Sequence, residues 1–315
     1  MEMSTNKPLH HAFIVNPKAG RFYDPGLMVR IEEYFSLDRS ADQTAEIILT
    51  DSNGHARSLA AELAERYGDR LIVIACGGDG TANEVANGIL GTGAAMSVFP
   101  IGTSNDFAKT VLSTIDPGKL VDRLRDLYVR PIDVIKVDDR ICLNITSLGF
   151  DTKVLNLSMA ITAKCRWIGP LAYHLAIMLA VFGNRQYPMH YQMEAATADG
   201  QTTTIEGNAI FILAALCNGR YYGNGFNPAP HASVDDGQLD FCLVDSLPLY
   251  RVLPLIPKYK KGLHLDDPAI HLCQVTKGTI EAGSGRLLGN IDGEPFEKEV
   301  INFEIIPGGL NFAFY

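Results

Sequence analysis

The stretch that most constrains the fold is residues 70–90, where a short apolar run leads into a glycine turn and then a helical pattern. Residues 71–76 are all apolar and rich in β-branched side chains, which is typical of a strand buried on both faces. The sequence Gly-Gly-Asp-Gly-Thr at 77–81 ends this strand, and Val85 and Ile89 continue with helical spacing. A strand, a glycine turn and a helix in this order predict an α/β unit whose helix N-terminus can bind a phosphate.

The residues of this turn favour phosphoryl transfer. Its glycines let the backbone approach a ligand closely, and Thr81 with Glu84 has the spacing of a capping box. Asp79 would repel a phosphate unless a divalent cation or a transferable proton is involved, as it is in phosphoryl transfer. The turn lacks the lysine of a P-loop and the third glycine of the dinucleotide fingerprint. For a glycine-rich turn alone, a tight turn that caps a helix would be the favoured interpretation.

Two further strand ends carry residues of the same kind. An apolar strand at 11–16 is followed by Pro-Lys-Ala-Gly at 17–20, and a strand at 95–100 is followed by a polar turn at 101–108. A plain turn or a helix cap explains each of them when it is considered alone. Because ligands gather beyond the carboxyl ends of strands in open α/β sheets, we expect these junctions to converge on one site.

Beyond about residue 130 the pattern changes to short strands separated by turns. This spacing predicts a mostly antiparallel β-sandwich, interrupted by one helical segment at about 153–182. We therefore expect two domains, an α/β domain with a parallel sheet at 1–132 and a β-sandwich domain at 133–315.

Composition and charge exclude several classes of function. The net charge of −9 argues against nucleic-acid binding and against strong general attraction to anionic membranes. The six cysteines include no C-x-x-C pair, and several lie in apolar runs, which favours reduced core residues in a cytoplasmic protein. The polar N-terminus and the short apolar stretches predict a soluble chain, so that any membrane contact would be local.

Two acidic segments of the second half are candidates for chemistry. Residues 228–240 include three carboxylates within six positions, which form either a solvated acidic turn or a site for a hard cation. Asp292 and Glu294 lie on a tight Asp-Gly turn, which on its own is an ordinary hairpin.

Two other segments, one apolar and one basic, each have more than one interpretation. The apolar residues between 167 and 182 form a core helix, an acyl-chain pocket or a membrane-facing surface, and the helical spacing favours a core helix. Lys258, Lys260 and Lys261 form either a solvated cluster, which is the favoured interpretation, or a contact with anionic headgroups.

Seven motifs in register resemble those of the bacterial diacylglycerol kinase and sphingosine kinase-type lipid kinases, from about Phe13 to the C-terminus. They are Asn16-Pro17-x-x-Gly20, Gly77-Gly78-Asp79-Gly80-Thr81-x-Asn83-Glu84, Pro100-x-Gly102-Thr103-x-Asn105-Asp106-Phe107-Ala108, Asn144-x-x-Ser147-x-Gly149-Phe150-Asp151, Gly169-Pro170-Leu171-Ala172-Tyr173, Asp236-Gly237-x-Leu239-Asp240 and Asp292-Gly293-Glu294. Each motif alone is weak, but seven in order are strong. The resemblance implies an α/β nucleotide-binding domain like that of NAD kinases and phosphofructokinases, followed by a β-sandwich.

The resemblance also implies roles for individual residues. Asp79 would serve the Mg²⁺-phosphate end, and Asp292 or Glu294 would take the proton from the lipid hydroxyl, a choice that spacing does not settle. A structural Mg²⁺ would be held by Asp236 with the loop carbonyls of Ser233 and Gln238. The residues expected to contact ATP are Asn16, Pro17, Lys18, Ala19, Gly20, Thr50, Gly77, Gly78, Asp79, Gly80, Thr81, Ala82, Asn83 and Thr103.

The predicted function is that of an ATP- and Mg²⁺-dependent kinase that phosphorylates the hydroxyl of diacylglycerol or a related lipid, giving a phosphatidic acid-type product. The expected partner is a lipid substrate at a membrane surface, without nucleic acid, and a homodimer is left open. The expected location is cytoplasmic or peripheral at the membrane. The alternatives are a kinase of the NAD kinase-like superfamily with a soluble substrate, and a non-catalytic ATP- or lipid-binding protein. The second alternative is disfavoured because Asp79, Asp292 and Glu294 are all present.

Overall fold

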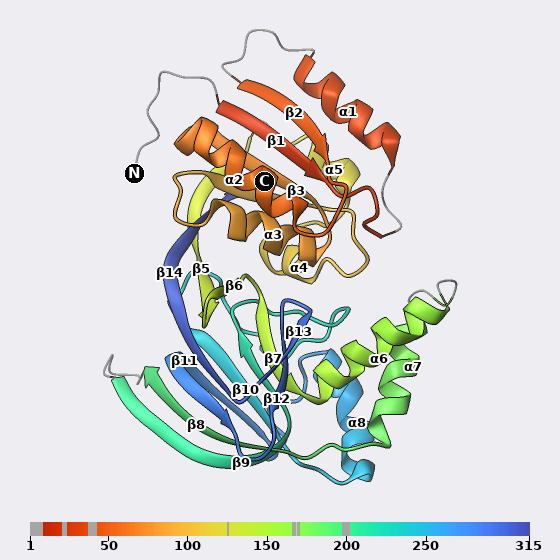
Figure 1. Cartoon of the computed structure of the whole chain (residues 1–315), viewed down its shortest axis with the longest axis vertical. Coiled ribbons are helices and arrows are strands. Elements are labelled where there is room, and N and C mark those ends of the chain that lie inside the picture. Colours follow the sequence, from red (N-terminus) through yellow and green to blue (C-terminus); the bar gives the residue numbers. More distant parts are fainter. Residues whose placement is uncertain are drawn as a thin grey trace. The chain divides into compact units, whose positions relative to one another are not determined.

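The computed structural model describes residues 9–20, 24–36, 43–124, 126–165, 168, 171–196 and 202–315. They form two compact units (Figure 1). Unit 1 comprises the chain up to Val134 together with Pro307–Tyr315, and unit 2 comprises Ile135–Ile306. The division predicted from the sequence assigns residues 307–315 to the second domain, whereas in the structure they pair with a strand of unit 1.

Unit 1 is built on a parallel sheet with the strand order β14-β4-β3-β1-β2. Its last strand is the C-terminal end of β14 (Val300–Phe314), where Asn311 and Phe312 pair with Ala95 and Met96. The other elements are β1 (Leu9–Val15), α1 (Pro25–Ser36), β2 (Gln43–Leu49), α2 (His55–Tyr67), η1 (Gly68–Arg70), β3 (Leu71–Gly77), α3 (Asp79–Ile89), β4 (Ala95–Pro100), α4 (Asp106–Val111) and α5 (Pro117–Val121).

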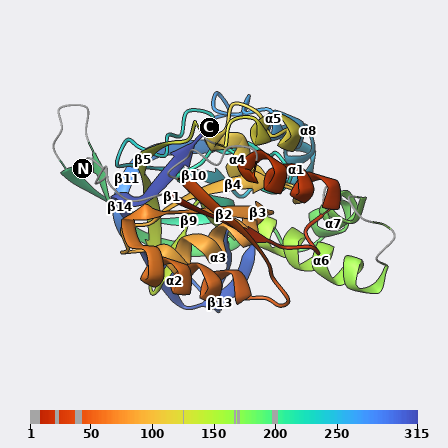
Figure 2. The ribbon, with the colours of Figure 1, turned by 90° about the horizontal axis from the view of Figure 1, so that it is seen from above.

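Helices cover both faces of this sheet, and for this reason every residue of β3 is buried. Ile72 and Ile74 pack with side chains of α1 and α5. Because successive side chains of a strand point to opposite faces, Leu71 and Val73 face the other side, toward α2 and α3. Figure 2 shows α1 and α5 on one side of β1 and β3 and α2 and α3 on the other. The predicted α/β fold with a buried parallel sheet is confirmed.

Unit 2 is an antiparallel β-sandwich with three helices among its described residues. β5 enters it from unit 1, and β14 leaves it. Its elements are β5 (Tyr128–Val137), β6 (Arg140–Cys142), β7 (Ile145–Gly149), α6 (Phe150–Lys164), α7 (Leu171–Val181), β8 (Tyr187–Ala196), β9 (Thr202–Cys217), β10 (Leu239–Asp245), α8 (Leu249–Lys260), β11 (Ile270–Ala282), β12 (Leu287–Ile291) and β13 (Glu294–Lys298).

Two long strands connect the layers of this sandwich. The first part of β9 pairs with β8, and its last part pairs with β7 and β10. Likewise, β11 pairs first with β10 and then with β8 and β14. The register of β11 against β8 shifts between Val275 and Lys277, which is how a strand bends from one layer into another. The apolar side chains of both layers meet in one core.

The helices of unit 2 differ in part from the prediction. The expected helical segment at about 153–182 contains two helices, α6 and α7, which pack against each other. Residues 166–167 and 169–170, which include the first two residues of the predicted Gly-Pro-Leu-Ala-Tyr motif, lie outside the described residues. The sequence did not predict α8, which contains Pro254 and Pro257. Across the described ranges, no helix is long and apolar enough to cross a membrane.

Candidate active site

Four loops of unit 1 start from strand ends that lie in register. Val15 pairs with both Leu49 and Cys76, and Gly77 pairs with Pro100, so the loops after β1, β2, β3 and β4 begin at the same edge of the sheet. Main-chain hydrogen bonds extend this alignment into the loops themselves. The N–H of Asn16 donates to the Cys76 carbonyl at 2.9 Å, and the N–H of Thr50 donates to the Val15 carbonyl at 2.8 Å.

These loops approach one another backbone to backbone. A Cβ on Gly102 would lie 2.4 Å from the Cα of Gly78, and a Cβ on Gly20 would lie 2.7 Å from the carbonyl carbon of Gly102. Gly20 also has a φ of +64°, which side chains rarely allow. The glycines of the three motifs therefore allow the main chains of the loops to lie close together. As a result, peptide groups rather than side chains lie at this edge of the sheet.

The start of α3 lies at the centre of this edge. The helix begins at Asp79, and its N-cap is Gly78, which has no side chain to accept from the first N–H groups. The expected capping box is wrong, because Thr81 lies inside the first turn, where the Nδ2 of Asn16 donates to its Oγ1 at 3.5 Å. A helix N-terminus without a side-chain cap presents N–H donors and a positive dipole end to an anion.

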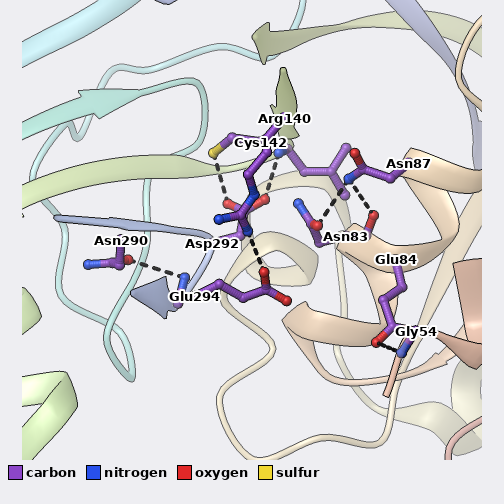
Figure 3. A network of polar contacts seen from close by, with 11 residues as sticks. Gly54, Asn83, Glu84, Asn87, Arg140, Cys142, Asn290, Asp292 and Glu294 are labelled. Atoms are coloured by element: carbon purple, nitrogen blue, oxygen red, sulfur yellow. Dashed lines mark hydrogen bonds and ion pairs between the residues drawn. The ribbon is translucent and has the colours of Figure 1, made fainter. Parts of the chain in front are cut away.

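Glu84 has another role in the structure. Its carboxylate accepts hydrogen bonds from the N–H groups of Gly54 at 2.9 Å and Ala56 at 3.1 Å, so it caps the start of α2 rather than that of α3 (Figure 3). A capping pattern in sequence is local, whereas this cap joins two residues that are thirty positions apart.

Asp79 connects the β3–α3 turn to the next loop. Its Oδ1 accepts the N–H of Phe107 at 2.9 Å, which orients the carboxylate and caps the start of α4. The neighbouring residue Asp106 is buried and forms an ion pair with Lys109, with 2.7 Å between Oδ1 and Nζ. This pair is absent from the predicted site residues. Its signal in the sequence is Asn105-Asp106 in the polar turn at 101–108, which a helix cap also explains.

The structure places the other predicted ATP-contacting residues in the same loops or in the first turns of α3. Lys18 is exposed, and its Nζ donates to the Asp51 carbonyl at 3.0 Å, which joins the β1 and β2 loops. The side chains of Thr81 and Ala82 are buried, so these two residues can offer a ligand only main-chain atoms. The contact of this set with ATP stays a prediction.

The predicted proton acceptors lie on a hairpin of unit 2. Asp292 and Gly293 join β12 to β13 with φ values of +48° and +86°, the signature of a tight two-residue turn. The Asp292 carboxylate is held by three main-chain N–H groups, those of Leu143 at 2.7 Å, Asn144 at 3.0 Å and Ile145 at 3.1 Å. It also accepts from the thiol of Cys142 at 3.1 Å (Figure 3).

Glu294 has a different environment on the same hairpin. It is exposed and forms an ion pair with Arg140 of β6 (Figure 3). The Asp292 carboxylate is therefore fixed by main-chain donors at the β6–β7 connection, and that of Glu294 by a cation of β6. Which of them accepts a proton stays a prediction.

The predicted cation loop brings several carboxylates close together. Asp236 Oδ1 accepts the N–H of Gln238 at 3.0 Å, and the hydroxyl of Ser233 donates to Asp235 at 2.6 Å. Burial, together with the nearby Asp236 carboxylate, raises the pKa of Asp240 to about 6. A hard cation would relieve this repulsion, so the loop fits the predicted Mg²⁺ site. The described ranges contain no cluster of three His, Cys, Asp or Glu side chains able to hold a metal, and the predicted set relies instead on one carboxylate and loop carbonyls.

An apolar cavity lies among α6, α7, α8 and the sheet of unit 2. Its volume is about 80 Å³. The lining is almost entirely apolar and comes from elements far apart in the sequence, as Phe150, Ile177, Leu213, Val252 and Leu255 illustrate. Pockets of this kind, with few polar groups, commonly bind small apolar ligands.

Asp151 is a charged residue of this lining, and the sequence analysis did not assign it to the site. It is buried, and burial raises the pKa of its carboxyl to about 7. Oδ1 accepts the N–H of Thr152 at 2.7 Å. Oδ2 accepts no hydrogen bond of ordinary geometry from the described residues. The nearby side chains of Ser147 and Tyr222 lower the pKa of the carboxyl and so offset part of the effect of burial. The signal for this residue is an acid placed directly between a buried strand and a helix.

Comparison with known families decides how these features are interpreted. The model of the diacylglycerol kinase catalytic domain matches residues 10–137, and that of the YegS C-terminal NAD kinase beta sandwich-like domain matches residues 144–314. The chain belongs to the family of YegS-like lipid kinases and diacylglycerol kinases. Members of this lipid kinase family are phosphotransferases that use ATP, so the predicted family and enzyme class are confirmed.

Relatives of this lipid kinase match it over most of their length. A probable lipid kinase YegS-like protein of Pseudomonas aeruginosa is 30% identical over 275 residues, covering 86% of this chain and 85% of the relative. The diacylglycerol kinase of Bacillus subtilis is 28% identical over 285 residues, covering 89% of this chain and 88% of the relative. A crystal structure of a diacylglycerol kinase from Bacillus anthracis shares the fold, with a TM-score of 0.72, 24% identity and 98% of both chains covered.

Proposed function

We propose that this lipid kinase transfers the γ-phosphoryl group of ATP, in the presence of Mg²⁺, to the hydroxyl of diacylglycerol or a related lipid. The product would be a phosphatidic acid-type lipid. Family membership supports phosphate transfer to a lipid. The observation that carries the choice of substrate is the apolar cavity of unit 2, because its lining suits an acyl chain and offers almost no partner to a highly charged soluble substrate such as NAD.

The glycine loops of unit 1 would receive the nucleotide phosphates. The uncapped N–H groups at the start of α3 supply donors, and the exposed Lys18 supplies a positive charge within the β1 loop. Asp79 would act at the end of the nucleotide where Mg²⁺ and the phosphates would lie. The hydrogen bond that it accepts from the N–H of Phe107 holds the carboxylate in one orientation. When bound, Mg²⁺ would neutralise charge that builds up on the phosphates.

The β12–β13 hairpin would supply the proton acceptor. Asp292 is oriented by its three main-chain donors, and Glu294 is held beside it by Arg140. A base for phosphoryl transfer must accept a hydrogen bond from the lipid hydroxyl as the new bond to phosphorus forms. We propose that the two carboxylates act as one unit, in which one accepts the proton and the other positions it.

The direct test is transfer of labelled phosphate from ATP to a panel that contains diacylglycerol, sphingosine and NAD. A labelled lipid that is lost with Asp79→Ala would support the proposal and identify the substrate. Labelled NAD alone would replace the proposal with a soluble substrate. ATP binding without any labelled product would replace it with a non-catalytic function.

The cavity is tested by a pair of neighbouring variants on α8. Val252 lines the cavity, whereas Leu253 next to it is 51% exposed. Val252→Trp should raise the KM for a long-chain lipid about tenfold or more, because the indole fills space that the chain would occupy. Leu253→Trp is the matched control, with the same side chain pointing away. Equal KM values for both variants would show that the cavity does not bind the substrate.

A further inference from the structure

The apolar cavity of unit 2 is lined by two residues that each bury a polar atom without a hydrogen bond of ordinary geometry. These atoms are Oδ2 of Asp151, at the start of α6, and the hydroxyl oxygen of Tyr259, near the end of α8 (Figure 1). Both are enclosed, and neither has such a bond with the described residues. Because an unsatisfied buried polar group costs free energy, the two atoms indicate a ligand group that pairs with them.

A third polar side chain, Tyr222, lies in the same wall. Burial and the neighbouring Asp151 carboxylate raise the pKa of Tyr222 well above its ordinary value, and the neighbouring Tyr259 hydroxyl offsets part of this effect. The carboxyl and the two phenols therefore lie near one another. The rest of the lining is mostly aliphatic or aromatic, so these groups form one polar spot in an apolar wall.

The described lining of the cavity contains no basic side chain that would pair with Asp151. Lys153, two positions further along α6, donates instead to the Asn184 carbonyl at 3.2 Å. Burial raises the pKa of Asp151 to about 7. Burial also raises the pKa of the other titratable groups around it, which are Tyr187, Cys217, Tyr222 and Tyr259. Of these groups, Asp151 is the one that changes its charge near neutral pH.

The size and chemistry of the cavity limit what can pair with this polar spot. A volume of about 80 Å³ has room for several water-sized groups, so the cavity holds only part of a lipid. That part must carry a polar atom, and it must be uncharged because the wall is mostly apolar. Apart from the hydroxyl that would be phosphorylated, the polar groups of diacylglycerol are its two esters. An ester carbonyl oxygen accepts hydrogen bonds, and a carboxylic acid and a phenol each donate one.

We propose that the protonated carboxyl of Asp151 and the hydroxyl of Tyr259 donate hydrogen bonds to an ester carbonyl of the lipid substrate. The contact places the first carbons of one acyl chain in the cavity. It makes the cavity selective for acyl esters over ether-linked chains, which lack the carbonyl oxygen. Both residues determine specificity and take no part in proton transfer to or from the reacting hydroxyl. This inference rests on the proposed lipid kinase function, because it names the feature of the substrate that the same enzyme recognises.

Kinetics with two matched substrates test the contact. One is dioctanoylglycerol and the other is dioctylglycerol, its dialkyl ether analogue, each dispersed in the same detergent. At about pH 6 the wild type should have a KM about tenfold lower for the ester than for the ether, with a similar kcat, because the ether leaves both donors without an acceptor. Equal KM values for the two lipids would overturn the proposal.

Three variants separate this contact from a role in folding. Asp151→Leu should raise the KM for the ester about tenfold and so abolish the preference, whereas Asp151→Asn keeps an N–H donor and should retain it. Tyr259→Phe should raise the same KM about threefold and still fold, because the hydroxyl that it removes has no ordinary hydrogen bond with the described residues. Asp266→Asn, at an exposed position between α8 and β11, is the control. Wild-type preference in Asp151→Leu would contradict the proposed contact.

The pH dependence of KM provides a readout that a merely structural role would not produce. As the pH rises from about 6 to about 8, Asp151 loses the proton that it would donate, so the wild-type KM for the ester should rise. It should stay flat in Asp151→Asn, whose amide does not titrate, and the KM for the ether should change less. A wild-type KM for the ester that falls with rising pH would show that the ionised carboxylate binds a hydrogen-bond donor, and the ester assignment would be wrong.

Binding without ATP keeps this inference separate from the proposed function. Calorimetric titration of the full chain with each lipid should give the same ester preference, and Asp151→Leu should lose it. That preference in a wild type that phosphorylates no lipid would refute the proposed function alone. Phosphorylation of dioctanoylglycerol without an ester preference in either binding or KM would refute this inference alone.

Discussion

Replacing Asp151 with asparagine should remove much of the pH dependence of the stability of unit 2. In the folded chain, burial raises the pKa of this carboxyl from 3.8 to about 7. The folded chain therefore retains the proton over a pH range in which the unfolded chain releases it. The free energy of unfolding consequently falls as the pH rises from about 4 to about 7, and it levels off above that range.

The size of this effect follows from the two pKa values. The interval between 3.8 and about 7 corresponds to a loss of about 4 kcal/mol in the free energy of unfolding. The side chain is only 7% exposed, so solvent screening reduces the value little. Asparagine has nearly the same shape and stays neutral, so it mimics the protonated acid at every pH.

Urea unfolding between about pH 5 and pH 8, followed by circular dichroism, measures this difference. The stability of Asp151→Asn relative to wild type should increase by about 2 kcal/mol between pH 5 and pH 7. Asp122→Asn, at a side chain that is 75% exposed in unit 1, is the control and should leave the profile unchanged. Parallel profiles for wild type and Asp151→Asn would refute the argument that burial governs this carboxyl.

Three further predictions concern the hairpin, the cap of α2 and the glycine loops. If the hairpin supplies the base, either Asp292→Asn or Glu294→Gln should lower kcat about a hundredfold or more, and wild-type kcat in both would exclude a base on this hairpin. Glu84→Gln should lower the free energy of unfolding by about 1 kcal/mol, because two N–H groups of α2 lose a charged acceptor; unchanged stability in thermal unfolding would refute the cap. Gly102→Ala should destabilise unit 1 by about 2 kcal/mol or more and abolish nucleotide binding, because its Cβ would meet the main chain of Gly78 at 2.4 Å. Wild-type stability and ATP affinity in that variant would show that the loops do not need this close approach.

The parts of the fold that the sequence predicts well are those with a local cause. The apolar run at 71–76 is typical of a strand covered on both faces, and the structure buries it completely. The glycines at 77–80 predict a close approach of main chain to a ligand, which stays a prediction. The structure shows that Gly78 also allows a close approach to Gly102, which in turn lies against Gly20.

Features with a long-range cause were missed or assigned wrongly. Glu84 has the local spacing of a cap for its own helix, but its carboxylate reaches the start of α2. The helix α8 contains two prolines, which normally end helices, and its buried side, including Val252 and Leu255, packs into the core around the cavity. The sequence places Asp151 between a buried strand and a helix, but its position in the cavity lining depends on three helices and a sheet that are far apart along the chain.

The arrangement of β14 has a consequence for how the protein is made. A chain grows from its N-terminus at about 5–20 residues per second, and early domains generally fold before later ones are complete. Unit 1 departs from that order, because β4 gains its outer partner only when Asn311 and Phe312 have left the ribosome. Every residue of β4 is buried in the folded protein. Until β14 pairs with it, β4 is an exposed edge strand of the nascent chain, and such an edge is a template for aggregation. Chaperones that shield such edges should therefore matter most for unit 1 while unit 2 is still being synthesised.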